Sequence, residues 1–117
     1  MKDDILSIKS KKFALKIIKL YKMLTKEKKE YIISKQLLKS ATSIGANIRE
    51  AQFAESKKDF ISKMSIALKE TGETLYWIEL LTESDYITPF QSKDIIQDCL
   101  ELLKILQATV KTSKKAN

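Results

Sequence analysis

Two carboxylates, one thiol and a row of lysines are the side chains of this sequence that could do chemistry. Glu70 and Glu73 lie three residues apart, which would place both carboxylates on one face of a helix and could serve acid–base chemistry or bind a metal. Carboxylate metal sites in helical bundles also use Glu-x-x-His motifs, and the sequence contains no His. We therefore expect neither a metal site nor a cofactor here.

The single cysteine, Cys99, has no histidine to activate it and no second cysteine to pair with. It falls in an apolar stripe, where a free cysteine usually acts as a small buried hydrophobe. The sequence has no Walker, dinucleotide-binding, zinc or nucleophile-elbow motif. Because these absences remove most familiar enzyme classes, we expect a protein without catalytic activity.

Lysines form one face of the first predicted helix. Residues 1–30 contain ten Lys against four acids, and the chain as a whole carries a net charge of +7. Clustered lysines attract phosphate backbones through counterion release, whereas a single arginine, Arg49, gives little scope for reading bases. Two interpretations stay open, a surface that binds RNA or DNA electrostatically and a solvated face. The lysines concerned are Lys9, Lys12, Lys16, Lys19, Lys22 and Lys26.

Helices are the elements that must position these side chains. Only two Gly and one Pro occur in 117 residues, so few positions can break a helix. Apolar residues recur at helical spacing in four segments, which predicts helices at about 5–25, 31–54, 57–84 and 89–112. Short connections favour antiparallel neighbours. We therefore expect one domain, 1–117, with an all-α, antiparallel up-down-up-down four-helix-bundle fold and a frayed basic tail at 113–117.

Local signals mark several of these boundaries. Ser56 begins a capping-box spacing before the third helix, and Thr88 with Gln91 does the same before the fourth. The charged segment 26–30 is interpreted as a solvated connection. Gly45 lies inside the second helix at a cost of about 1 kcal/mol relative to Ala, which indicates a close contact between helices.

Apolar residues of the third predicted helix fall on two surfaces, of which only one can belong to the core. The second surface combines apolar and acidic side chains, and we interpret it as an oligomer interface where acids meet lysines of another copy. The interface candidates are Ile66, Glu70, Glu73, Trp77 and Leu80.

A polar line runs beside the apolar stripe of the second helix. Ser43, Asn47 and Glu50 follow one another at helical spacing. Buried polar groups must be paired, so we interpret the line as a network that fixes helix register or subunit contacts. A ligand or nucleic-acid site is the alternative.

Three segments of the chain carry a family resemblance. They are 35–51, which contains Ser-Ile-x-x-Asn-Ile-x-Glu-Ala from Ser43 to Ala51, then 56–60 and 67–81. The sequence from about residue 13 to the fourth helix resembles the 23S ribosomal-RNA intervening-sequence protein family, whose members are four-helix bundles. The resemblance implies a homopentamer and supplies no catalytic residue.

The same resemblance suggests nucleic acid as a partner. Some members of the family are encoded inside insertions of bacterial large-subunit ribosomal RNA genes, and a related basic barrel assists a reverse transcriptase in diversity-generating retroelements. We therefore expect a homo-oligomer that presents lysine faces to RNA, DNA or a nucleoprotein, with a purely structural or protein-interaction module as the alternative. The sequence has no long uncharged apolar run and no signal peptide, so we expect a cytoplasmic protein with no membrane partner.

Overall fold

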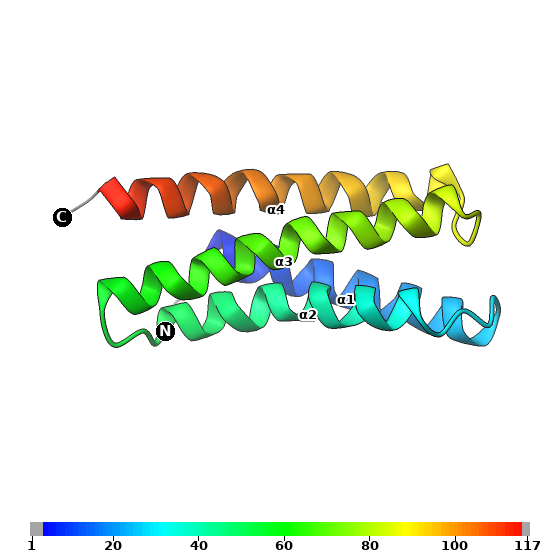
Figure 1. Ribbon diagram of the computed structural model, residues 1–117, viewed down its shortest axis with the longest axis horizontal. Helices are drawn as coiled ribbons and strands as arrows, with labels where there is room; N and C mark the ends of the chain where they lie inside the picture. Colours follow the sequence, from blue (N-terminus) through cyan, green and yellow to red (C-terminus); the bar gives the residue numbers. More distant parts are fainter. Residues whose placement is uncertain (1–3, 116–117) are drawn as a thin grey trace.

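The computed structural model describes residues 4–115, and this part of the chain forms four α-helices (Figure 1). They run antiparallel to their neighbours in a molecule about 49 Å long and 22 Å across. The all-α fold predicted from the sequence is confirmed. The helices are α1 (Ile5–Lys26), α2 (Ile33–Gln52), α3 (Lys57–Glu83) and α4 (Pro89–Lys115).

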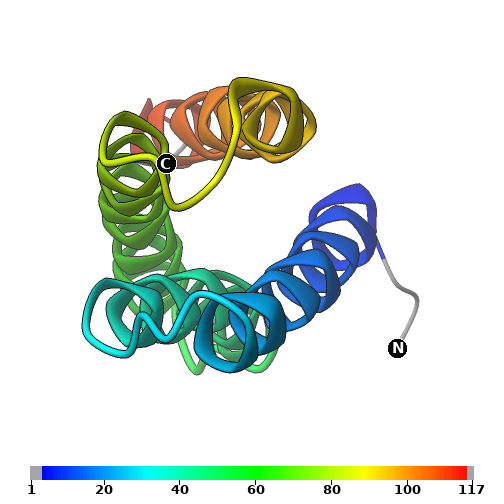
Figure 2. The same ribbon diagram turned by 90° about the vertical axis from the view of Figure 1, so that its right-hand side faces the viewer.

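The four helices follow one another in chain order around the long axis, as the end-on view in Figure 2 shows. α2 and α3 share the most extensive interface, and the contact between α1 and α4 is the smallest of the four. The bundle is therefore closed most weakly along the α1–α4 seam. No helix in residues 4–115 is long and apolar enough to cross a membrane.

One apolar stripe from each helix builds the core. The stripe of α2, predicted from spacing alone, is buried throughout and consists of Leu37, Ala41, Ile44, Ile48 and Ala51. On α3 the buried positions advance in steps of three and four residues, as a straight seam between helices requires. Two of them are threonines, whose hydroxyls are paired: Thr71 donates to the Ala67 carbonyl, and the Thr74 hydroxyl donates to the Glu70 carbonyl at 2.7 Å and lies 2.9 Å from Ser40 Oγ.

The predicted capping residues begin α3 and α4. Ser56 Oγ accepts a hydrogen bond from the Asp59 N–H at 3.0 Å. Thr88 and Gln91 bond reciprocally, since Thr88 Oγ1 accepts from the Gln91 N–H and Gln91 Oε1 accepts from the Thr88 N–H. Each pair satisfies donors that the first turn of a helix leaves without a partner.

The connection between α1 and α2 is exposed at residues 26–29, as predicted, but the expectation of a solvated segment is wrong at Glu30. Glu30 is only 7% exposed, and its carboxylate accepts hydrogen bonds from the N–H groups of Ile32, Ile33 and Ser34 at 2.6–3.1 Å. Lys29, with φ of 56°, adopts the left-handed conformation that turns the chain back. α2 accordingly begins at Ile33 instead of 31, and Glu30 acts as its cap.

The far ends of α2 and α4 also differ from the prediction. α2 ends at Gln52 instead of 54, because the N–H groups of Phe53 and Ala54 turn back to the carbonyls of Glu50 and Ala51. α4 continues to Lys115, so residues 113–115 of the predicted frayed tail are helical, while 116–117 lie outside the described residues. Lysines in a last helical turn interact favourably with its macrodipole, which explains the extension.

Gly45 marks a close contact between α1 and α2, as its place in a helix predicted. A Cβ at this position would lie 3.3 Å from Ser10 Oγ, tighter than an ordinary van der Waals contact. Gly72, the other glycine, would meet nothing within 4 Å. Only Gly45 is therefore explained by packing.

Candidate nucleic-acid interface

α1 gathers the six predicted lysines, but the structure divides them between two environments. Lys9 and Lys16 face α4, where Lys9 Nζ donates to Glu101 Oε1 at 2.9 Å. Lys16 Nζ donates to Asp94 Oδ2 at 2.8 Å and to Asp98 Oδ2 at 2.6 Å. The hydrogen bonds that Lys16 donates to Asp94 and then to Asp98 raise the pKa of its ammonium above 10.5. These two lysines are therefore partly neutralised within the chain.

The other four lysines are exposed and form no ion pair within residues 4–115. Three of them recur every seven residues, and seven residues advance an α-helix by about 10 Å, so they form a row about 21 Å long. The row consists of Lys12, Lys19 and Lys26, and Lys22 lies beside it.

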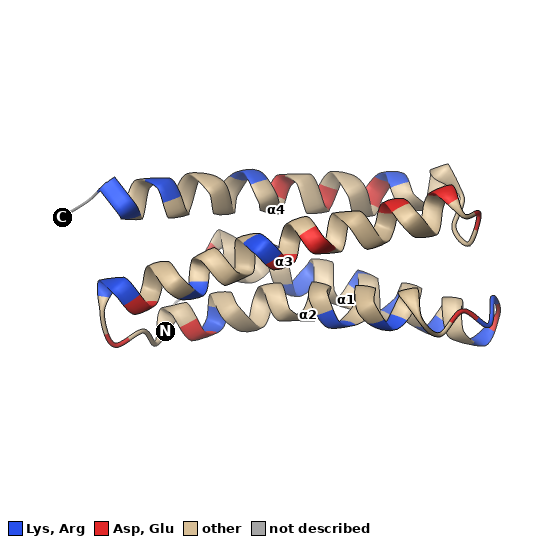
Figure 3. Cartoon of the chain, in the orientation of Figure 1, with Lys and Arg blue, Asp and Glu red and all other residues tan. Residues whose placement is uncertain are grey.

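Charge is segregated along the whole chain. Residues 5–52 contain twelve Lys or Arg against three acids, which gives +9, whereas residues 70–101 contain eight acids against Lys93, which gives −7. Figure 3 shows the acids gathered on the halves of α3 and α4 that meet at their connecting turn. The molecule therefore has a basic half, built by α1 and α2, and an acidic surface, built by residues 70–101.

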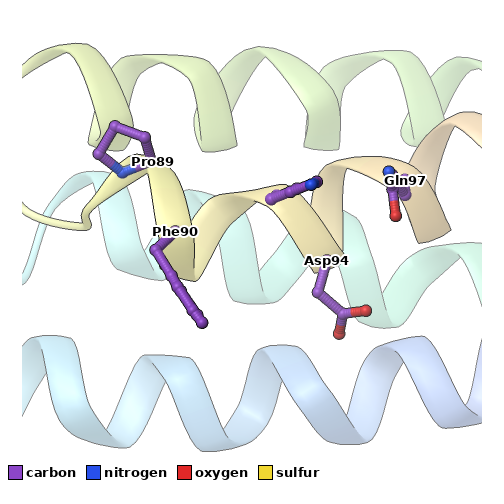
Figure 4. Close-up of a pocket in the computed structure, with 5 residues that line it drawn as sticks. Pro89, Phe90, Asp94 and Gln97 are labelled. Atoms are coloured by element: carbon purple, nitrogen blue, oxygen red, sulfur yellow. The ribbon is translucent and has the colours of Figure 1, made fainter.

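Shallow hollows lie along the α1–α4 seam. One of them, of about 450 Å³, has an apolar floor that includes Leu20, Met23 and Ile95. Beside it, Figure 4 shows Phe90 and Asp94 pointing from α4 toward α1. Phe90 is 79% exposed, so its ring overhangs this seam without being enclosed. The hollows expose core side chains because the contact between the two helices is small.

On the opposite side of α1, a groove along α2 brings together two cations that the spacing of residues did not connect. Lys11 and Arg49 both line it. Lys11 belongs to the lysine-rich helix, but its approach to Arg49 depends on how α1 packs on α2. Sequence spacing within each helix carries no signal for that contact.

The predicted polar line on α2 is partly a local network. Asn47 Nδ2 donates to the Ser43 carbonyl at 2.9 Å and to Ser43 Oγ at 3.0 Å, both within the helix. Glu50 is exposed, and its Oε1 forms an ion pair with Lys63 Nζ of α3 at 3.2 Å. The line thus joins α2 to α3 only at Glu50.

The predicted interface strip of α3 lies on the flank toward α2. Glu70 is half-buried and Glu73 exposed. Burial, followed by the nearby charge of Glu73, raises the pKa of the Glu70 carboxyl. Ile66 is 38% exposed, whereas Leu80 is half-buried. The strip therefore contains one open apolar side chain and an acidic pair.

Trp77, a further candidate of the interface strip, is partly covered by its own chain, and its place at a contact with another copy stays a prediction. The indole is half-buried and packs against the core of its own chain, and its Nε1–H is enclosed without an acceptor in residues 4–115. Thr74, one helical turn earlier, bonds to Ser40 of α2 and shows that this flank faces α2. The indole ring of Trp77, at the edge of the core stripe of α3, therefore lies partly in the interface between α2 and α3.

Cys99 is fully buried, as its place in the apolar stripe of the fourth helix predicted. Its Sγ donates to the Thr71 carbonyl at 3.5 Å. Burial raises the pKa of the thiol to about 12, so the reactive thiolate does not form near neutral pH.

Fold and surface together define an all-α, four-helix protein whose charges are separated into a basic half and an acidic surface. The chain belongs to the 23S rRNA-intervening sequence protein family, whose model matches residues 2–108. It is similar to the crystal structure of a protein with unknown function from the S23 ribosomal protein family of Bacteroides thetaiotaomicron VPI-5482. The TM-score is 0.90 and the identity 51%, over 92% of this chain and 99% of that one. Among curated proteins, none matches the chain.

Proposed function

We propose that this protein is a non-enzymatic, homo-oligomeric helical bundle that binds RNA or DNA electrostatically. The observation that carries the proposal is the row of exposed lysines on α1, which have no ion-pair partner within residues 4–115. Lys9 and Lys16, on the same helix, show that acids of this chain do pair with lysines where they reach them. Unpaired cations in a row are suited to a polyanion.

The mechanism is neutralisation of phosphates with release of their counterions. Lysine ammonium groups contact phosphates as point charges and do not make the bidentate bonds of arginine. Binding should therefore depend steeply on salt and weakly on sequence. The description of the family, which links it to insertions in 23S ribosomal RNA, supports a nucleic acid as the polyanion.

Assembly multiplies this contact, and we expect five copies, as the resemblance to the family implied. The separated charges of one chain support a contact between unlike surfaces, the acidic surface of one copy against the exposed α2 lysines, Lys35 and Lys39, of the next, so that the row on α1 stays open to a nucleic acid. Contacts between unlike surfaces generate rings when the rotation closes. Several lysine rows on one ring would raise a weak affinity through effective concentration.

The binding proposal is tested by titrating fluorescently labelled RNA and duplex DNA at about 50 mM and about 200 mM salt. We expect binding at the lower salt, with little preference among sequences and a loss of affinity of at least tenfold at the higher salt, as about three phosphate contacts predict. No binding of either nucleic acid at low salt would reject the proposal.

The assembly proposal is tested by sedimentation velocity of the wild type and of Glu73→Lys. Glu73 is exposed on the acidic surface, so the reversal should leave the fold intact and shift the mass from five copies toward one. Glu55→Lys, the same reversal outside that surface, is the matched control and should sediment as the wild type. A Glu73→Lys protein of unchanged mass would exclude this surface from the interface.

A structural or protein-interaction module without nucleic-acid binding is the second candidate. It is favoured by the ion pairs of Lys9 and Lys16, which give part of the lysine face a role inside the chain. The same titration separates the two functions, since this candidate predicts an oligomer that binds no nucleic acid at low salt.

A further inference from the structure

The α1–α2 groove is a polar concave surface that lies outside the lysine row. It has a volume of about 410 Å³ and is lined by Lys11 of α1 and Arg49 of α2, together with Ser7, Ser10 and Thr42. Gly45 lies against Ser10 and keeps the groove free of a larger side chain. α1 and α2 therefore approach each other closely beneath the groove, and each helix contributes one cation to its lining.

Neither cation of the groove is neutralised by the part of the chain that the structure describes. The ion pairs of residues 4–115 engage Lys9, Lys16 and Lys63, and leave Lys11 and Arg49 without a carboxylate. Like charges that line one groove repel each other unless an anion lies between them. Their placement therefore favours an anionic ligand.

The hydroxyl groups of the groove give a second, independent indication. Ser10 and Thr42 donate to the carbonyls of Ser7 and Leu38, so their protons are used inside the helices. Ser7 Oγ accepts a bond from Gln52 Nε2 but donates to no acceptor in residues 4–115, although the residue is only 9% exposed. A buried hydroxyl whose proton meets no acceptor among residues 4–115 can donate to a ligand oxygen.

We infer that the α1–α2 groove binds a phosphodiester of a nucleic-acid strand, with Arg49 and Lys11 on the phosphate oxygens and the Ser7 hydroxyl as a further donor. The inference rests on the proposed function and gives it a defined site. Arg49 is the only arginine of the chain, and a guanidinium can hold two phosphate oxygens at once. The volume of the groove leaves room for the adjoining sugar.

The test compares two double variants that lose the same charge. Lys11→Gln/Arg49→Gln removes the cations of the groove, and Lys57→Gln/Lys58→Gln removes two exposed lysines at the start of α3, away from it. The probe is a labelled single-stranded RNA, titrated at several salt concentrations. We expect the groove variant to bind at least tenfold more weakly than the control variant, with a salt slope lower by about 1 to 2.

A third variant tests the groove without changing charge. Ala46 lines the groove and is exposed on α2, so Ala46→Gln should fill the trough and leave the helix intact. We expect this variant to weaken RNA binding with the net charge unchanged, and circular dichroism to match the wild type.

The outcomes separate the two proposals. A wild type that binds no RNA at low salt would reject the proposed function itself. A wild type that binds RNA, with groove and control variants equally affected, would overturn the groove and leave the lysine row as the site. Polyglutamate that displaces the RNA as well as an equal concentration of unlabelled RNA would overturn the phosphodiester assignment in favour of an acidic protein.

Discussion

The two sides of α1 are held by different means. Toward α2, the helix is seated by close packing at Gly45 and Ser10, and the cations at the rim have no partner among the described residues. Toward α4, packing is sparse, and the helix is tied by ion pairs of Lys9 and Lys16 with three carboxylates. On the side of α1 that is held by packing against α2, the cations therefore remain available to a ligand.

This difference explains why the lysine-rich helix is not a uniform binding face. The ion-paired side chains at the α4 seam are 33–67% exposed, and exposed pairs contribute only about 0.2–1 kcal/mol each. A phosphate backbone would have to displace α4 carboxylates to use Lys9 or Lys16, whereas the other four lysines form no ion pair in residues 4–115. The comparison therefore predicts different responses of the two seams to packing changes, pH and salt.

The largest expected effect is a break of the packed seam by Gly45→Leu. The new Cβ alone would lie 3.3 Å from Ser10 Oγ, and the rest of the side chain would force α1 away from α2. Overpacking of this kind costs about 1–3 kcal/mol, so urea unfolding followed by circular dichroism should show a stability loss in that range.

Gly72→Leu is the matched control for this substitution. Gly72 is exposed in α3, and nothing lies within 4 Å of an added Cβ. Leucine is the better helix former by roughly 0.5–1 kcal/mol, so this variant should be as stable as the wild type or more stable. Equal losses at both glycines would mean that Gly45 does not mark a tight contact.

A second, smaller effect concerns the cap that fixes where α2 begins beside α1. Burial raises the pKa of Glu30, but the bonds from three backbone N–H groups outweigh it and leave the pKa below 4.5. Glu30→Gln should therefore lower the free energy of unfolding by about 1–2 kcal/mol at neutral pH. Exposed Glu27, replaced by Gln, is the control and should change stability little.

The pH dependence of this effect has a definite sign. A carboxyl with a lowered folded pKa contributes stability above its ordinary value of 4.5, and that contribution is lost as the pH falls through the lower folded value. The gap between wild type and Glu30→Gln should close in acid, as measured by chemical unfolding at a series of pH values. A gap that is constant with pH would show that the charge of Glu30 is not what caps α2.

Residues that act within their own helix were predictable from the sequence, and so was the close contact at Gly45, but the other partners between helices were not. The buried stripe of α2 and the Thr88–Gln91 cap follow from spacing, because the partners lie a few residues apart. The burial of Glu30 depends on a left-handed turn at Lys29, which composition does not reveal.

The same limit applies to the candidate site. All six lysines could be placed on one helix from their spacing, but their division between paired and unpaired sides depends on which face of α1 meets α4. The groove between Lys11 and Arg49 likewise exists only through the packing of α1 on α2. The partial burial of Trp77 likewise depends on how α3 packs on α2.

The smallest expected effect tests the α4 seam directly through a double-mutant cycle of Lys16→Ala and Asp98→Ala. Because the pair is partly exposed, its coupling energy should be below about 1 kcal/mol and should fall as salt is raised. The raised pKa of Lys16 means that the contribution is full below 10.5 and is lost as the pH rises through the higher folded value. Lys22→Ala, in place of Lys16→Ala, gives the control cycle and should show no coupling. A coupling above about 2 kcal/mol that is insensitive to salt would mean that the seam is a desolvated contact, and that α4 holds these lysines too firmly for any polyanion to reach them.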